Sequence, residues 1–273
     1  MDSLTFFLKY ARYRYIAYRL YLRMKMGKKK RDVYLQKAGM SVTDFLPERP
    51  YSFNGIKTIP RKGTQDFYML YLAREEEVKP HLQMYENETF VDVGANVGSY
   101  SLNIANDYKD SKIKVIAIEA HPENYKALCR NVEINKFNHI IKTVNKAASD
   151  NKGLATMYER IHIDDRVRSD FYSLCDTFLH ETNFVRPQGK PIQVECDTLD
   201  NILSPYKSDV MKIDIEGAEV GALKGAATTL KHLRKIIVEV HGNNFENVKE
   251  ILEDNDFRLH TVKGNMVHII GSR

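Results

Sequence analysis

The sequence of 273 residues predicts an α/β fold with a mostly parallel sheet. From residue 89 onward, short apolar runs alternate with helical patterns of roughly 10–15 residues, an alternation typical of βαβ units with right-handed crossovers. Near the end, two apolar runs flank Lys263-Gly264-Asn265, which is typical of a hairpin turn. Together these observations predict a parallel sheet that finishes in an antiparallel hairpin.

Each expected element rests on its own local pattern. Apolar runs predict strands at 89–93, 114–118, 140–144, 154–159, 192–195, 210–213, 235–240, 257–262 and 266–270. Apolar residues at helical spacing predict helices at 99–108, 122–135, 198–203, 217–231 and 244–254, and a further helix within 65–84. The polar stretch 160–190 interrupts this order, and long insertions of this kind are usually functional or disordered.

The distribution of charge sets the N-terminal end apart from the rest. The chain has 41 basic and 36 acidic residues, a formal net charge of +5. Residues 1–31 contain ten Lys or Arg and one acid, so the remaining residues are net negative. We therefore expect two parts, a basic, aromatic and helical extension at 1–88 and the α/β domain at 89–273.

The basic segment 1–31 allows three roles. Its tyrosines interleave with arginines, and such residues can stack on bases and contact phosphates, which favours RNA such as tRNA as a partner. Helical spacing over 4–24 also gives an apolar stripe that could pack on the domain or on a second subunit of a homo-oligomer. Attachment to an anionic membrane surface is the third role.

The three cysteines, Cys129, Cys175 and Cys196, lie far apart and form no metal-binding motif. Free thiols in a reducing compartment are the simplest interpretation. Charged residues interrupt every candidate signal peptide, and no apolar run has the roughly 18 residues of a spanning helix. The sequence thus predicts a cytoplasmic protein without a transmembrane segment.

The clearest local motif runs from Phe90 to Tyr100, Phe-Val-Asp-Val-Gly-Ala-Asn-Val-Gly-Ser-Tyr. Gly94 and Gly98 fall in the turn between a strand and a helix, where glycine lets the backbone approach a ligand. The spacing differs from dinucleotide and P-loop patterns, so a nucleoside or amino-acid moiety fits better than a pyrophosphate. Asp92 could receive an ammonium group or cap the next helix.

Acids also lie at the ends of three further strands. Glu119 ends the second strand, where a carboxylate can accept both ribose hydroxyls. Asp214 and Glu216 follow a strand that also contains Lys212, which could neutralise them. At the next strand end, Glu239 and His241 offer another acid and an imidazole that could act as a general base.

Six motifs follow one another in an order that resembles the FkbM family of S-adenosylmethionine-dependent methyltransferases, over about residues 89–242. They are Val91–Gly98, Glu119 with Pro122-Glu123-Asn124, Ala147–Asp150, Asp197–Asp200, Lys212–Glu219 and Glu239-Val240-His241. The block Lys-Ile-Asp-Ile-Glu-Gly-Ala-Glu at 212–219 is the most specific of the six. The resemblance implies a Rossmann-like class I methyltransferase with a seven-stranded, mostly parallel sheet.

The resemblance also implies the cofactor and the site. S-adenosylmethionine would be the cofactor, with Gly94, Asn96 and Gly98 at its methionine part and Glu119 at its ribose. The residues implied to bind it are Asp92, Gly94, Ala95, Asn96, Gly98, Tyr100, Glu119, Ala120, Asn124, Ala147, Ala148 and Asp214. Candidate catalytic residues are Asp214, Glu216, Glu239 and His241.

Three functions stay open at this point. The family resemblance favours methylation of a hydroxyl on a small-molecule or sugar-type acceptor. The basic segment favours RNA (tRNA) methylation, or a non-catalytic nucleic-acid-binding protein on a methyltransferase scaffold. Asp214, Glu216 and Glu239 could bind a divalent cation, but three acids at one edge do not define a coordination geometry, so we favour a site without metal.

Overall fold

The computed structural model describes residues 48–61, 64, 66–71, 77–162, 167–173, 185–186, 191–264 and 266–273. The expected helix at 4–24, the basic segment 1–31 and Cys175 lie outside these residues. Cys129 and Cys196 are free thiols, as expected. Among the helices of the described part, none has both the length and the apolar character needed to cross a bilayer.

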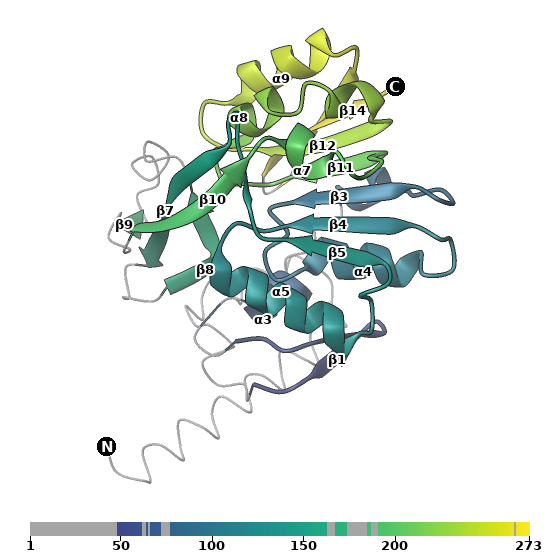
Figure 1. Ribbon diagram of the computed structural model, residues 1–273, viewed down its shortest axis with the longest axis vertical. Coiled ribbons are helices and arrows are strands. Elements are labelled where there is room, and N and C mark those ends of the chain that lie inside the picture. Colours follow the sequence, from purple (N-terminus) through teal and green to yellow (C-terminus); the bar gives the residue numbers. More distant parts are fainter. Residues whose placement is uncertain are drawn as a thin grey trace.

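A seven-stranded sheet forms the centre of the described chain (Figure 1). Its order is β13-β14-β12-β11-β3-β4-β5, and only β14 runs antiparallel to its two neighbours. The strands are β3 (Thr89–Val93), β4 (Lys114–Ile118), β5 (Ile141–Val144), β11 (Val210–Ile213), β12 (Lys235–Val240), β13 (Arg258–Lys263) and β14 (Val267–Ser272). The predicted parallel sheet with a C-terminal antiparallel hairpin is confirmed.

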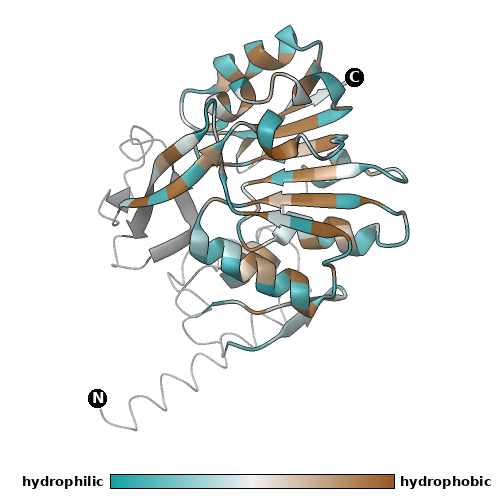
Figure 2. Ribbon diagram, in the orientation of Figure 1, coloured by the Kyte–Doolittle hydropathy of each residue, from teal (hydrophilic) through white to brown (hydrophobic). Residues whose placement is uncertain are grey.

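The central strands are apolar on both faces because helices cover both faces. Successive side chains of a strand point to opposite sides. Phe90 and Val115 belong to one buried cluster, whereas Val91 and Ile116 belong to the other. In Figure 2 these strands are mostly brown, as a doubly covered sheet requires.

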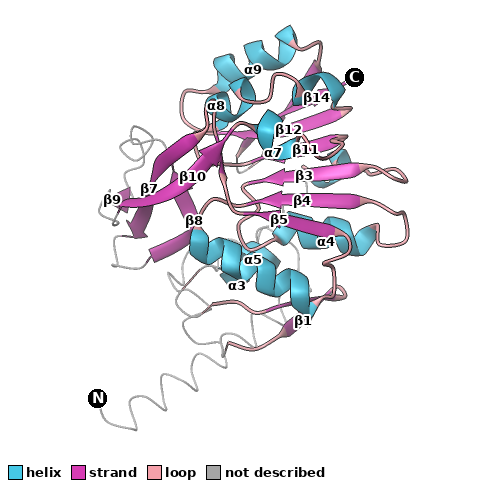
Figure 3. Cartoon of the chain, in the orientation of Figure 1, coloured by secondary structure: helices cyan, strands magenta, loops and turns pink. Residues whose placement is uncertain are grey.

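Helices from different parts of the chain cover the two faces (Figure 3). α4 (Ser99–Asp107) and α5 (Pro122–Ile134) pack on one face together with the segment before the sheet. α7 (Leu199–Leu203), α8 (Glu219–Lys224) and α9 (Phe245–Asp254) pack on the other.

The segment before the sheet contributes to the same core. It contains the antiparallel pair β1 (Tyr51–Phe53) and β2 (Ile56–Thr58), then α3 (Asp66–Tyr71) and a short 3-10 turn at Lys79–His81. Within 65–84 the described residues form α3 and this short 3-10 turn, in which Pro80 lacks the amide donor that a continuing α-helix needs. Ile56 and Leu70 are buried in the cluster that contains Phe90.

A second sheet stands beside the carboxyl ends of the central strands (Figure 1). It contains β6 (Ala147–Ala148), β7 (Gly153–His162), β8 (Val167–Ser173), β9 (Val185–Arg186) and β10 (Pro191–Asp197). The strands expected at 154–159 and 192–195 are the centres of β7 and β10, which pair antiparallel. Between residues 160 and 190, the described part adds β8 and β9 to this sheet.

The helix expected at 217–231 is divided in two. α8 ends at Lys224, and a 3-10 turn, η3, covers Thr229–His232. The carboxylate of Asp200 accepts hydrogen bonds from the amides of Thr228 (2.9 Å) and Thr229 (2.7 Å), which holds the chain in a new direction. At the break, a Cβ on Gly225 would overlap the carbonyl oxygen of Ser149.

This packing gives a test of the fold. We expect Gly225→Ala to lower the free energy of unfolding by about 1–3 kcal/mol, because the neighbouring backbone must move. Gly153→Ala is the matched control, since no atom lies within 4 Å of a Cβ at Gly153. Urea denaturation measures both variants, and equal stability of the two would contradict the packing at Gly225.

Candidate functional site

Strand register brings residues at the carboxyl ends of four strands to one level. Val93 of β3 pairs with Ile118 of β4 and with Ile213 of β11, and Ile213 pairs with Val238 of β12. The next residues in these strands are Gly94, Glu119, Asp214 and Glu239. The carboxyl edge of the sheet therefore presents a glycine turn between carboxylates.

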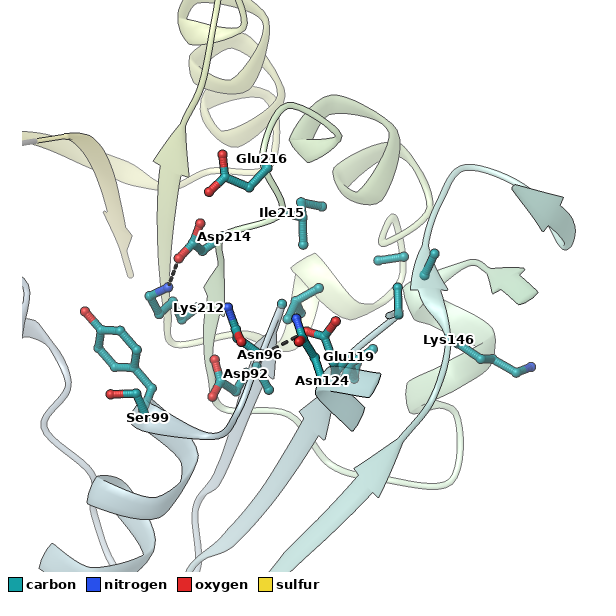
Figure 4. A pocket seen from close by; sticks show the side chains of 18 of the residues that line it. Asp92, Asn96, Ser99, Glu119, Asn124, Lys146, Lys212, Asp214, Ile215 and Glu216 are labelled. Carbon is teal, nitrogen blue, oxygen red and sulfur yellow. Dashed lines mark hydrogen bonds and ion pairs between the residues drawn. The ribbon is translucent and has the colours of Figure 1, made fainter. Parts of the chain in front are cut away.

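A pocket of about 990 Å³, counted out to its open mouth, lies at this edge (Figure 4). The lining residues come from α3, α4, α5, both sheets and the loops between them: Met69, Asp92, Val93, Gly94, Ala95, Asn96, Ser99, Tyr100, Ile118, Glu119, Ala120, Asn124, Lys146, Ala147, Ala148, Met157, Lys212, Asp214, Ile215 and Glu216.

The turn after β3 needs glycine for two reasons. Gly94 has a φ of 82°, and a Cβ there would overlap the carbonyl oxygen of Asp214. The amides of Gly94 and Ala95 both donate to the carbonyl of Ile118 at 2.9 Å, which fixes the turn against β4. Any larger residue would separate β3 from β11 and disturb the floor of the pocket.

Asp92, near the end of β3, and Gly98, just before α4, have structural roles on either side of the turn. One carboxylate oxygen of Asp92 accepts from the amide (3.0 Å) and the hydroxyl (2.6 Å) of Ser101, so Asp92 ties the strand to α4. Burial raises the pKa of Asp92. A Cβ on Gly98 would lie 2.8 Å from Leu128, so glycine there allows α4 to approach α5.

Glu119 holds its carboxylate at the edge of the pocket through two backbone amides. One oxygen accepts from the amide of Asn96 and the other from the amide of His121, each at 2.8 Å. Burial raises the pKa of Glu119 to about 7, although these two hydrogen bonds act in the opposite direction. Each oxygen retains a second lone pair, so the carboxylate can still accept from the hydroxyls of a ligand.

Lys212 is the cation beside Asp214, as the sequence suggested. Its Nζ lies 2.8 Å from Oδ2 of Asp214 and 4.4 Å from the centre of the Tyr100 ring. The lysine side chain is 1% exposed, whereas that of Asp214 is 23% exposed. Asp214 therefore faces the pocket with its charge compensated from within the sheet.

A buried histidine stands behind the acids. Nδ1 of His241 lies 2.9 Å from Glu219, and Nε2 lies 3.1 Å from Glu239 and 3.5 Å from Glu216. Burial alone would lower the pKa of His241, but the contacts with Glu219 and Glu239 raise it to about 11. Burial and Asp214 would raise the pKa of Glu239, but His241 and His268 bring it down to about 2. His241 is thus a protonated partner of the surrounding carboxylates at neutral pH.

The same cluster contains a set of atoms that could hold a metal. The carboxylates of Asp214 and Glu216 and the imidazole of His241 offer atoms that all lie within 4.8 Å of one another. Both ring nitrogens of His241 already face carboxylate oxygens at 2.9 and 3.1 Å. A metal would have to displace a proton from that imidazole, since metals bind the neutral form.

The structure brings together most of the residues named from the sequence. Asp92, Gly94, Ala95, Asn96, Tyr100, Glu119, Ala120, Asn124, Ala147, Ala148, Asp214 and Glu216 all line the pocket. Gly98, Glu239 and His241 are outside the lining given by the described residues and stand behind it. Sequence reasoning missed Met69 of α3, Met157 of β7 and Lys146, which precedes β6, because these segments reach the pocket only through tertiary packing.

Comparison with known proteins gives a family. The model of the Methyltransferase FkbM domain matches residues 92–259. Methyltransferase sdnD of Sordaria araneosa is 27% identical over 198 residues, which cover 63% of this chain and 74% of that protein. A tRNA(Phe) (4-demethylwyosine(37)-C(7)) aminocarboxypropyltransferase of Methanocaldococcus jannaschii is 33% identical over 106 residues, 38% of each protein.

A solved structure shares the fold. The crystal structure of methyltransferase FkbM from Methylobacillus flagellatus KT matches with a TM-score of 0.50 and 19% sequence identity. The match covers 76% of this chain and 48% of that chain, so the present chain spans about half the length of the solved relative.

The ion pair between Lys212 and Asp214 gives a prediction about stability. We expect Lys212→Met to lower the free energy of unfolding by about 3–5 kcal/mol, because it leaves a partly buried carboxylate beside other acids without its cation. Adding Asp214→Asn should restore part of this loss. Lys142→Met, at an exposed lysine of β5, is the control, and thermal unfolding compares the variants. A loss that Asp214→Asn leaves unchanged would argue against the pair.

The raised pKa of Glu119 predicts a pH dependence. The folded state retains a proton on Glu119 up to about pH 7, whereas the usual pKa is 4.5. Between these values the folded state binds more protons than the unfolded state, so this group makes stability fall as pH rises, by up to about 1.4 kcal/mol per pH unit.

Glu119→Gln should remove this slope, and urea denaturation at pH 5, 6, 7 and 8 measures it. Glu123→Gln is the control, because a hydrogen bond from Lys126 lowers the pKa of the exposed Glu123 and its titration falls below this range. Parallel stability curves for the wild type and Glu119→Gln would contradict the assignment.

Proposed function

The chain belongs to the FkbM methyltransferase family, and we propose that it transfers a methyl group to a hydroxyl of a small-molecule or sugar-type acceptor. It is an enzyme, an S-adenosylmethionine-dependent methyltransferase. The observation that carries the proposal is the meeting of the glycine turn, Glu119 and Asp214 in a single pocket. A cytoplasmic location stays a prediction from the cysteines.

The residues at the sheet edge fit S-adenosylmethionine. The strand-end carboxylate of Glu119 can accept from ribose hydroxyls, and the turn at Gly94 leaves room for a ligand beside its backbone. Ala147 and Ala148 are small, buried residues that offer an apolar wall for the adenine. Asn96 follows the turn and lies toward the methionine part in our proposal.

The proposed mechanism divides two tasks among the acids. When bound, S-adenosylmethionine supplies an activated methyl group on a sulfonium. Asp214, held by Lys212, orients the acceptor hydroxyl at the mouth of the pocket. Glu216 would accept the proton of the acceptor hydroxyl, and the bound cofactor would supply the methyl group that takes the place of this proton on the oxygen. We choose Glu216 because its contact with His241, at 3.5 Å, is longer than that of Asp214 with Lys212, at 2.8 Å.

His241 and Glu239 take positioning roles in this proposal. A protonated His241 cannot accept the substrate proton, so the general-base role considered from the sequence passes to a carboxylate. Its charge instead holds Glu216 and Glu239 at the edge. We propose that the reaction needs no metal, because both nitrogens of His241 serve this ionic network.

RNA methylation is the second candidate. The relative in Methanocaldococcus jannaschii acts on tRNA(Phe), and it shares 33% identity over 106 residues. The basic segment 1–31 would then dock nucleic acid, whose binding weakens steeply with salt. A non-catalytic nucleic-acid-binding protein is a third alternative, which the acidic edge of the pocket disfavours.

Methyl transfer from labelled S-adenosylmethionine to separate pools of sugars, small hydroxyl compounds and bulk tRNA tests these functions. We expect label in a hydroxyl-containing pool, no effect of EDTA, and no label with Gly94→Arg, which obstructs the turn. Glu216→Gln should lower kcat roughly 100-fold or more, as removal of a general base does.

Other outcomes of the transfer assay would favour one of the alternative functions or contradict the metal-free mechanism. Label in tRNA that is lost when residues 1–31 are removed would favour the RNA enzyme. Tight tRNA binding without any transfer would favour the non-catalytic alternative. Loss of activity in EDTA that Mg²⁺ restores would contradict the metal-free mechanism.

A further inference from the structure

The segment that precedes the family match is fastened along α5. The side-chain oxygen of Asn135 accepts a hydrogen bond from the backbone N–H of Lys57 (2.8 Å). The side-chain oxygen of Asn131 accepts one from the backbone N–H of Ile59 (3.0 Å). Arg130 donates to the carbonyl of Ile59 at 2.7 Å. One face of α5 therefore binds the backbone of residues 57–59 and leads the chain toward the pocket.

Arg61 is the next contact along α5, and it reaches a residue of the pocket lining. Its Nη2 donates to Oδ1 of Asn124 at 2.8 Å. The same guanidinium donates through Nε and Nη2 to the two carboxylate oxygens of Asp66, each at 2.8 Å, and the Arg61 amide adds a bond of 2.9 Å. Asp66 is 1% exposed, so this ion pair is largely desolvated.

The contact fixes the orientation of the Asn124 amide. Arginine has donors and no acceptor, so the oxygen of Asn124 must face Arg61 and the amide nitrogen must point away from it. Asn124 is 1% exposed and lines the pocket. Asp66 begins α3, whose Met69 lines the pocket as well, so the same pair anchors a second part of the wall.

We propose that Arg61 is a positioning residue for cofactor binding, acting through Asn124. It lies outside the residues 92–259 that match the family, and it makes the preceding segment part of the cofactor site. The inference rests on the proposed seat of S-adenosylmethionine. A donor held in place by Arg61 loses less freedom on binding, which favours affinity for the cofactor.

A double-mutant cycle in the full chain tests this role. We expect Arg61→Ala and Asn124→Ala each to raise the KM and Kd for S-adenosylmethionine about tenfold, as the loss of one well-placed hydrogen bond does, with little change in kcat. In the double variant the Kd for S-adenosylmethionine should also be about tenfold above the wild-type value, because both changes remove the same interaction. Calorimetry and initial rates give the two constants.

Two further variants separate positioning from folding. Arg61→Lys keeps a cation for Asp66 but lacks the planar fork, so it should weaken cofactor binding while unfolding closer to the wild-type temperature than Arg61→Ala does. Arg130→Ala removes a neighbouring anchor of the same segment without touching Asn124. It should lower the unfolding temperature and leave the Kd unchanged.

The outcomes are distinct. Equal effects of Arg61→Ala and Arg130→Ala on the Kd, or additive effects in the cycle, would overturn the positioning role and leave the proposed function intact. If the wild-type chain failed to bind S-adenosylmethionine, the proposed function would fail and this inference with it.

Discussion

The register of β3 between β4 and β11 decides where everything else in the site lies. Because Val93 pairs with both Ile118 and Ile213, the next residues of three strands reach the same level. A shift by one residue would turn each acid to the opposite face of the sheet. The buried apolar faces of these strands fix the register, so the core determines the geometry of the pocket.

Buried cations balance the negative charge of the acids at this edge of the sheet. Four acids, Asp214, Glu216, Glu219 and Glu239, lie around His241, and Lys212 approaches from within β11. A buried carboxylate is costly unless it is paired, so the cations let several acids stand together. The acids differ in accessibility, since Asp214 and Glu216 line the pocket whereas Glu219 and Glu239 are buried.

The segment before the central sheet lies outside the family match, but it belongs to the same core and lines the same pocket. Side chains of α5 bind its backbone, and apolar residues from Ile56 to Met84 join the core beneath α4 and α5. The division at residue 88 therefore passes through one hydrophobic cluster. Met69 from this segment and Met157 from the second sheet both line the pocket, so elements outside the central sheet contribute to its wall.

The sequence by itself determined the central strands, the acids and glycines at their ends, and most of the residues that line the pocket. Strands at 89–93, 114–118, 210–213 and 235–240 were predicted with the bounds that the structure has, because buried parallel strands are continuous apolar runs. Acids and glycines at their ends were visible as local exceptions to that pattern. Only the tertiary structure decided which acids line the pocket, that three carboxylates surround His241, and that Arg61 reaches Asn124. These depend on contacts between residues far apart in the chain and on burial, and neither has a local signature in the sequence.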